Sequence, residues 1–172
     1  MGLFYPDILK NHIADITVPD LENLGAKALL LDVDNTLTHH GSQELSPEIE
    51  SWLDEMRAHG FKMCIVSNAF EKRIAPFAKK LGLSYSAFSC KPFPFGFLRA
   101  AKRFGLKRRE CVAIGDQVFT DILGAKIAGV HTIQVMPMHG PHTATLRLKR
   151  GLEGKVMKRY QKYLNKKGRD DG

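Results

Sequence analysis

Short apolar runs alternate with amphipathic stretches along most of this chain. The runs have the length and the unbroken hydrophobicity of strands buried on both faces of a sheet, and they cover residues 27–31, 61–66, 85–88, 111–114 and 130–135. Between them, apolar residues recur at helical spacing over residues 47–59, 70–81, 95–104 and 120–128, and a glycine follows each stretch, as is common at helix C-termini. This alternation predicts an α/β, Rossmann-like fold with an open, doubly wound parallel sheet.

The size and composition of the chain indicate one globular domain with a distinct C-terminal end. Its 172 residues suit a single domain, and 44% hydrophobic with 26% charged residues is an ordinary globular mixture. We expect residues 1–24 to pack on the core as an N-terminal segment and residues 25–140 to form the α/β core. Residues 141–172 are expected to form a basic amphipathic helix and tail.

Two features of the sequence favour a cytoplasmic location. No apolar run reaches the roughly 18 residues that span a bilayer, and the N-terminus lacks the basic region and cleavage site of a secretory signal. Cys64 and Cys111 lie inside apolar runs, where buried, reduced thiols are expected.

Most of the positive charge lies at the C-terminal end. The net charge is +8, and residues 147–172 hold ten Lys and Arg against three Asp and Glu. Leu152, Val156, Tyr160 and Leu164 recur every four residues among these basic side chains. The pattern predicts a basic helix that either contacts an anionic membrane or packs on its own domain. Nucleic acid is a less favoured partner because few aromatic residues are interleaved with the basic ones.

Polar side chains follow several of the predicted strands. They are Asp32, Asp34, Ser67, Lys91, Asp116 and Asp121. Because ligands of such sheets bind at the carboxyl ends of the strands, we expect these side chains to share one cleft. Clustered carboxylates repel one another unless a divalent cation lies among them, and hard oxygen ligands favour Mg²⁺. A neighbouring lysine would bind an anion, and phosphate is the anion that suits both groups.

The spacing of the first two carboxylates suggests covalent catalysis. Residues two apart on extended chain project to the same side, so Asp32 and Asp34 could both reach one phosphorus atom. One carboxylate can attack phosphorus, and a second can protonate the leaving oxygen and later deprotonate water. Thr36 is expected to fix the loop by hydrogen bonding. His39 and His40 follow it; a surface loop is the expectation for both, and contact with substrate is the alternative.

Four motifs carry a resemblance to a known superfamily. The segment DVDNTL at residues 32–37, Ser67-Asn68, Lys91-Pro92 and GDQVFTD at residues 115–121 resemble, in order and spacing, the motifs of the haloacid dehalogenase (HAD) phosphatases. More narrowly, Pro6-Asp7 together with the first and last of these motifs resembles the YqeG family, a bacterial branch related to mitochondrial phosphatidylglycerophosphate phosphatases.

The resemblance implies a role for each matching carboxylate. Asp32 would be the nucleophile and a Mg²⁺ ligand, and Asp34 would be the general acid and base, with its backbone carbonyl on the metal. Asp116 would complete the metal ligands, and Asp121 would act behind them or through water.

The phosphate ligands and the substrate class follow from the same resemblance. Ser67 and Asn68 would hold phosphate oxygens, and Lys91 would balance the charge of Asp32 and the phosphoryl group. A cap domain has no room, because a single helix fills each interval where one would be inserted. The resemblance, together with the basic helix, therefore implies a capless phosphatase acting on phosphatidylglycerophosphate or another accessible phosphate. The alternatives are a phosphatase of small soluble sugar or nucleotide monophosphates, and a phosphate-sensing protein that binds RNA or the ribosome. The sequence gives no oligomeric state.

Overall fold

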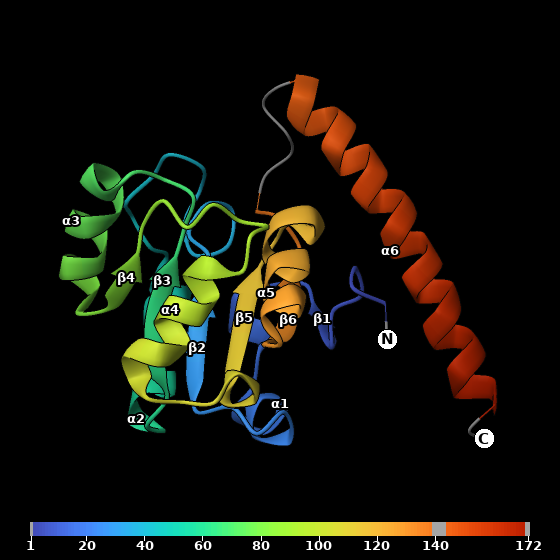
Figure 1. Cartoon of the computed structure of the whole chain (residues 1–172), viewed down its shortest axis with the longest axis horizontal. Helices are drawn as coiled ribbons and strands as arrows, with labels where there is room; N and C mark the ends of the chain where they lie inside the picture. Colours follow the sequence, from blue (N-terminus) through green and yellow to red (C-terminus); the bar gives the residue numbers. More distant parts are fainter. Residues whose placement is uncertain (1, 139–143, 171–172) are drawn as a thin grey trace.

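A six-stranded parallel sheet forms the centre of the molecule (Figure 1). The computed structural model describes residues 2–138 and 144–170, and the side chains of residues 2–138, 151–163 and 165. The strand order is β1-β6-β5-β2-β3-β4. Every neighbouring pair is parallel. The strands are β1 (Ile8–Lys10), β2 (Ala28–Leu31), β3 (Lys62–Val66), β4 (Ser84–Ser86), β5 (Cys111–Gly115) and β6 (His131–Val135).

Helices cover both faces of this sheet, which confirms the doubly wound α/β fold (Figure 1). On one face, Leu29 and Leu31 of β2 pack in a cluster with residues of α2 (Pro47–Ala58) and α3 (Glu71–Leu81). On the other face, Leu30 packs with residues of α4 (Phe95–Phe104) and α5 (Leu123–Ala128). Successive strand residues point to opposite faces, so unbroken apolar strands are needed to fill both layers.

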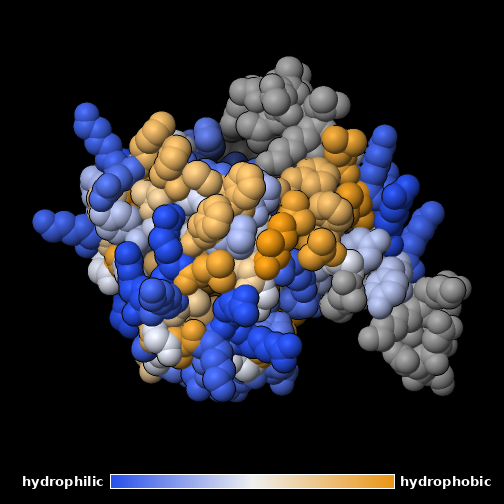
Figure 2. All heavy atoms as spheres, viewed as in Figure 1, coloured by the Kyte–Doolittle hydropathy of each residue, from blue (hydrophilic) through white to orange (hydrophobic). Residues whose placement is uncertain are grey.

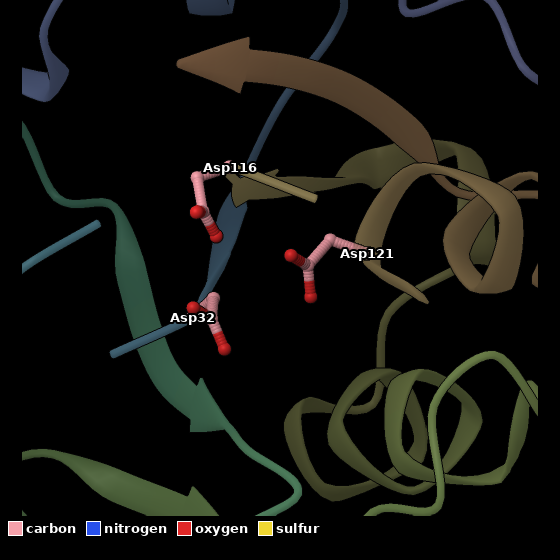
Figure 3. A group of neighbouring side chains, drawn as sticks. All are labelled: Asp32, Asp116 and Asp121. Carbon is pink, nitrogen blue, oxygen red and sulfur yellow. The ribbon is translucent and has the colours of Figure 1, made fainter. Parts of the chain in front are cut away.

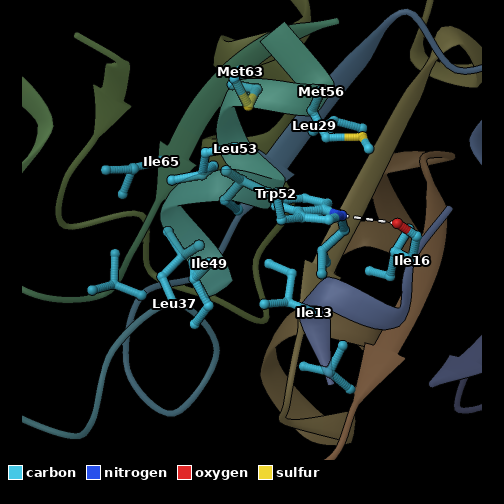
Figure 4. Close-up of a cluster of buried hydrophobic side chains, with 14 of the residues drawn as sticks. Ile13, Ile16, Leu29, Leu37, Ile49, Trp52, Leu53, Met56, Met63 and Ile65 are labelled. Atoms are coloured by element: carbon cyan, nitrogen blue, oxygen red, sulfur yellow. Dashed lines mark hydrogen bonds between the residues drawn. The ribbon is translucent and has the colours of Figure 1, made fainter. Parts of the chain in front are cut away.

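The start of α2 illustrates how the sequence sets an element and its packing. Ser46 caps the helix through the Ile49 N–H, and Pro47 occupies the first helical position. The buried face of α2 then brings Trp52 into the core, where its indole N–H donates to the Ile16 carbonyl at 2.8 Å (Figure 4). This bond joins α2 to the N-terminal segment.

The N-terminal segment contains a strand that the apolar pattern did not reveal. Strand β1 extends the sheet beside β6. Asp7 secures it: its carboxylate accepts from the Thr132 N–H at 2.8 Å and from Lys126 Nζ at 2.6 Å. A 3₁₀ turn at Ile13–Asp15 and the helix α1 (Val18–Asn23), capped by Thr17, lead on to β2. Another 3₁₀ turn, Arg108–Glu110, precedes β5.

The chain ends in a long helix, α6 (Ala144–Asp170), which runs beside the N-terminal segment (Figure 1). Tyr160 is buried, and its hydroxyl donates to the Pro6 carbonyl at 2.9 Å. Leu152, expected on the same apolar stripe, is 48% exposed, whereas Glu153 is buried. The Leu164 side chain lies outside the described residues, as do those of Lys166 and Lys167. No helix in the described part of the chain is long and apolar enough to cross a membrane.

Candidate active site

Three carboxylates converge at the carboxyl edge of the sheet (Figure 3). Asp32 follows β2, Asp116 follows the neighbouring strand β5, and Asp121 lies in the turn after β5. One oxygen from each carboxylate lies within 4.8 Å of the other two, and all three residues are buried. Parallel pairing of β2 with β5 therefore brings together residues that lie more than eighty positions apart in the sequence.

The position of Asp121 depends on a glycine and on an unusual turn. Residues Val118–Ile122 form a π-helical turn, a conformation that is often found at functional sites. The turn folds Asp121 back so that its Oδ2 accepts from the Gln117 N–H at 3.1 Å. A Cβ atom at Gly115 would lie 2.6 Å from the Asp121 side chain, so only glycine allows this carboxylate so close to the strand end.

Lys91 lies between two of the carboxylates. Its Nζ atom is 2.6 Å from Asp32 Oδ1, 2.6 Å from Asp121 Oδ1 and 2.9 Å from the Val66 carbonyl. The loop that carries it is fixed by Asn68, whose side-chain amide accepts from the Lys91 N–H at 2.7 Å and donates to the Lys91 carbonyl at 3.0 Å. Asn68 thus joins two loops, and the expectation that it holds phosphate oxygens stays a prediction.

Burial and charge shift the ionisation of both partners. Burial raises the pKa of Asp32; Lys91 lowers it, but Asp121 and Asp116 raise it again, and the resulting pKa is about 8. Burial acts to lower the pKa of Lys91, but Asp121 and Asp32 raise it above its ordinary value. The Lys91 ammonium therefore pairs with two buried carboxylates, those of Asp32 and Asp121, and the buried Asp116 lies beside them.

The residues at this edge fit a divalent cation. Asp32 Oδ2 is buried and has no hydrogen-bond partner among the described residues. Such an oxygen is costly unless another group satisfies it. Three close carboxylates supply hard oxygen ligands, and their uncompensated charge would be neutralised by a cation.

Asp34 occupies a different part of the site. Its carboxylate is held by Arg73, whose Nη2 and Nη1 atoms lie 2.6 Å from Oδ1 and 2.9 Å from Oδ2. The Gly41 N–H donates to it at 3.1 Å, and His40 Nδ1 lies 3.3 Å from Oδ1. Burial acts to raise the pKa of Asp34, but these contacts, Arg73 first, bring it below its usual value. Sequence reasoning missed Arg73, which lies in an ordinary charged helix start.

The remaining expected residues line the same edge. Ser67 is buried at the end of β3, and its Oγ accepts from the Ala69 N–H at 3.1 Å. Thr36 bonds in this loop through its backbone N–H, whereas its buried hydroxyl has no partner among the described residues. The loop is closed instead by backbone bonds, because the Val33 carbonyl accepts from the N–H groups of residues 36, 37 and 38.

Comparison with known families gives two profile matches. The haloacid dehalogenase-like hydrolases match residues 40–129, and the mitochondrial PGP phosphatases match residues 2–77. The second match includes Asp32 and Asp34, and the first includes Ser67, Lys91, Asp116 and Asp121.

Individual proteins show the same relationship. The chain is 36% identical to the probable phosphatase YqeG of Bacillus subtilis, over 90% of each protein. It is 33% identical to the glyceraldehyde 3-phosphate phosphatase of Methanopyrus kandleri, over 52% of this chain and 42% of that protein. A cobalt-bound structure of the deoxy-D-mannose-octulosonate 8-phosphate phosphatase from Haemophilus influenzae superposes with a TM-score of 0.53 at 14% identity, covering 65% of this chain and 69% of that one.

Proposed function

This chain belongs to the haloacid dehalogenase-like phosphatases, and on that premise we propose that it hydrolyses phosphate monoesters through a phosphoryl group carried on Asp32. The observation that carries the proposal is the Asp32 carboxylate itself. Lys91 binds one of its oxygens at 2.6 Å, and the other has no hydrogen-bond partner among the described residues. Lys91 thus orients the carboxylate, to which we assign the attack on phosphorus.

The reaction takes two steps. Asp32 forms a bond to phosphorus as the bond to the leaving oxygen breaks, and protonated Asp34 gives that oxygen its proton. Ionised Asp34 then takes a proton from water, whose oxygen attacks phosphorus and releases inorganic phosphate from Asp32. The observed pair with Arg73 favours the ionised carboxylate, so one of the two contacts gives way to the proton while the other keeps Asp34 oriented.

The other residues stabilise charge around the phosphoryl group. Lys91 offsets the charge of Asp32 and Asp121, and the Ser67 hydroxyl can donate to a phosphate oxygen. Asp32, Asp116 and Asp121 are the side chains that would hold Mg²⁺, either directly or through water. When bound, Mg²⁺ would neutralise the developing negative charge of the phosphoryl oxygens.

We assign phosphatidylglycerophosphate, a lipid phosphate, as the favoured substrate. Support comes from the PGP phosphatase match over residues 2–77 and from the net charge of +8, which suits an anionic surface. Between β2 and β3, and again between β3 and β4, the chain forms a single helix, so neither interval holds a cap over the site. A small soluble phosphate is the second candidate, favoured by the similarity to glyceraldehyde 3-phosphate phosphatase.

A substrate panel tests the proposal. The purified protein is assayed with p-nitrophenyl phosphate, glyceraldehyde 3-phosphate and phosphatidylglycerophosphate in vesicles, each with Mg²⁺ and with excess EDTA. We expect Mg²⁺-dependent turnover of all accessible monoesters and the highest kcat/KM for the lipid. A higher kcat/KM for the soluble phosphate would favour the second candidate. Phosphate binding without turnover of any monoester would instead favour a sensor.

A further inference from the structure

Four phenylalanine side chains project into solvent from the loops around the candidate active site. Phe70, Phe88, Phe93 and Phe95, which we call the phenylalanine rim, are 73%, 59%, 61% and 58% exposed. In the space-filling view, apolar surface extends from the loops at the carboxyl edge of the sheet across α5 toward α6, with hydrophilic side chains below it (Figure 2). Large apolar side chains that gather on one surface mark an interaction site more often than isolated ones do.

The rim is built on the loops that carry the phosphate-site residues. Phe70 lies two residues after Asn68, and Phe88 and Phe93 lie on either side of Lys91. Lys91 points inward to Asp32 and Asp121, whereas its phenylalanine neighbours point outward. The rings stack in pairs, with centroids 5.7 Å apart for Phe70 and Phe88 and 6.1 Å apart for Phe93 and Phe95. The Phe88 N–H also donates to the Ala69 carbonyl at 2.9 Å.

Phenylalanine is a poor local choice at two of these positions. Phe70 is the N-cap of α3 and makes no side-chain cap hydrogen bond, although Ser or Asp would supply one. Phe88 has φ = 44°, a left-handed conformation that bulky side chains rarely adopt. Local rules are broken where a residue serves a function that outweighs them. The exposed rings therefore require a reason outside the packing of the monomer.

We propose that the phenylalanine rim docks the candidate active site on a bilayer that contains anionic phospholipid, so that a lipid phosphate can enter the site from the membrane surface. This inference rests on the proposed phosphatase function and identifies the surface through which the lipid arrives. Aromatic side chains insert into the interface between headgroups and acyl chains, and basic residues beside them are attracted to anionic lipid.

The charges next to the rim suit such a surface. Lys72 follows Phe70 on α3, and Arg99 lies one helical turn after Phe95 on α4; both side chains are exposed. Glu71, the acidic residue between Phe70 and Lys72, accepts a hydrogen bond from the Tyr85 hydroxyl at 2.8 Å. A phosphorylated residue of another protein is the alternative substrate at this surface. Lipid is favoured over it because the exposed phenylalanines lie beside cations and because the chain matches the PGP phosphatases.

Two substitutions remove rim hydrophobicity without a cost to the fold. Phe70→Ser introduces an N-cap residue, and Phe88→Asn places a residue that tolerates positive φ at residue 88. The matched control is Ile127→Ser, because Ile127 is 49% exposed near the end of α5 that leads to the amino end of β6. Vesicles of phosphatidylglycerol and phosphatidylcholine are sedimented with each full-length protein, and bound protein is measured; thermal unfolding verifies folding.

We expect the Phe70→Ser/Phe88→Asn double variant to bind these vesicles about tenfold more weakly, with unchanged or higher thermal stability and unchanged p-nitrophenyl phosphate turnover. The Ile127→Ser control should bind as the wild type does. Equal vesicle binding by the double variant and the wild type would overturn the inference, as would a wild type that binds no vesicles. Vesicle binding through the rim without hydrolysis of any lipid phosphate would retain the docking surface and contradict the lipid substrate.

Discussion

At the scale of single residues, the candidate site depends on an imbalance of charge. The Lys91 ammonium pairs with two of three buried carboxylates, and one carboxylate oxygen of Asp32 is left without a hydrogen bond among the described residues. This imbalance accounts for the fit to a divalent cation, and Lys91 holds the other oxygen of the proposed nucleophile. Replacing one of these charged residues should therefore change both the free energy of unfolding and the rate of turnover.

Replacing the nucleophile should separate these two effects. Asp32→Asn removes the attacking oxygen and one charge from a repulsive cluster, so we expect turnover to fall by about a thousandfold or more. The free energy of unfolding should stay level or rise, because burial and two neighbouring carboxylates disfavour the ionised Asp32. Steady-state kinetics and urea unfolding measure the two quantities. Turnover at the wild-type rate would contradict the role of Asp32.

Arg73 should act through Asp34 rather than on the substrate's phosphorus. Its two hydrogen bonds orient the Asp34 carboxylate, so Arg73→Gln should lower kcat by about ten- to a hundredfold while KM changes little. Arg73→Lys retains the charge with a single-point contact and should restore part of the loss. The kinetics of both variants with p-nitrophenyl phosphate provide the measurement. A rise in KM with kcat unchanged would show that Arg73 binds substrate and does not position Asp34.

The sequence allowed some of these residues to be predicted and not others. Asp32, Ser67, Lys91, Asp116 and Asp121 each follow a predicted strand or begin the next helix, so topology alone brings them to one edge. Arg73 lies within the charged run Glu71-Lys72-Arg73, which looks like any solvated helix start. Its contact depends on how the loop after β2 folds back, and hydrophobic periodicity does not encode that geometry.

At the scale of elements, the same contrast holds for the strands. Each of the five predicted runs overlaps a strand of the structure, although β4 begins at Ser84 and ends at Ser86, inside the run predicted at residues 85–88. Strand β1 has only three residues, and they are half-buried at the edge of the sheet. Its position is fixed by Asp7, a polar residue that no periodicity analysis would select. Helical spacing likewise predicts ordinary helix over residues 120–128, whereas the structure forms a π-helical turn at Val118–Ile122 before α5.

The contacts of the Asp7 carboxylate with Lys126 and Thr132 should stabilise the fold in a pH-dependent way. Burial acts to raise the pKa of Asp7, but bonds from Lys126 and Thr132 lower it in the folded protein. The stabilisation is therefore present above the unfolded pKa of about 3.9 and is lost as the pH falls through the lower folded pKa. Asp7→Asn should cost about 1–3 kcal/mol at pH 7.

Urea unfolding of wild type and Asp7→Asn at pH 7 and pH 3 measures this effect. The difference between the two proteins should shrink at pH 3, where the wild-type carboxylate begins to take up protons. If the two proteins differ equally in their free energy of unfolding at both pH values, the stabilisation by Asp7 comes from its packing and neutral hydrogen bonds and not from its charge.

In the whole molecule, the buried Tyr160 side chain of α6 and those of the phenylalanine rim point in opposite directions relative to the core. The helix directs Tyr160 inward onto the N-terminal segment, with a hydrogen bond to Pro6 and a ring contact to Tyr5 at 5.0 Å. The rim directs its side chains outward around the site. The basic sequence of α6 predicts a helix that either contacts an anionic membrane or packs on its own domain, because repeated spacing does not reveal which side of a helix faces its own domain.

Tyr160→Ala should therefore destabilise the protein without disabling the site. We expect a loss of about 3 kcal/mol in the free energy of unfolding, because a buried aromatic ring and its hydrogen bond are removed. The kcat/KM for p-nitrophenyl phosphate should change little, since Tyr160 contacts none of the site residues described above. Unchanged stability with lost vesicle binding would instead assign this face of α6 to the membrane.

In the proposed reaction the phosphoryl group passes through Asp32. The most direct test is to quench the protein with acid during turnover of p-nitrophenyl phosphate, reduce the trapped acyl phosphate with borohydride, and locate the modified residue by peptide mass spectrometry. We expect the modification on Asp32, in a larger amount in Asp34→Asn, because that variant lacks the base that activates water for the second step. Turnover with no modified Asp32 peptide, or with the modification on another residue, would contradict the account.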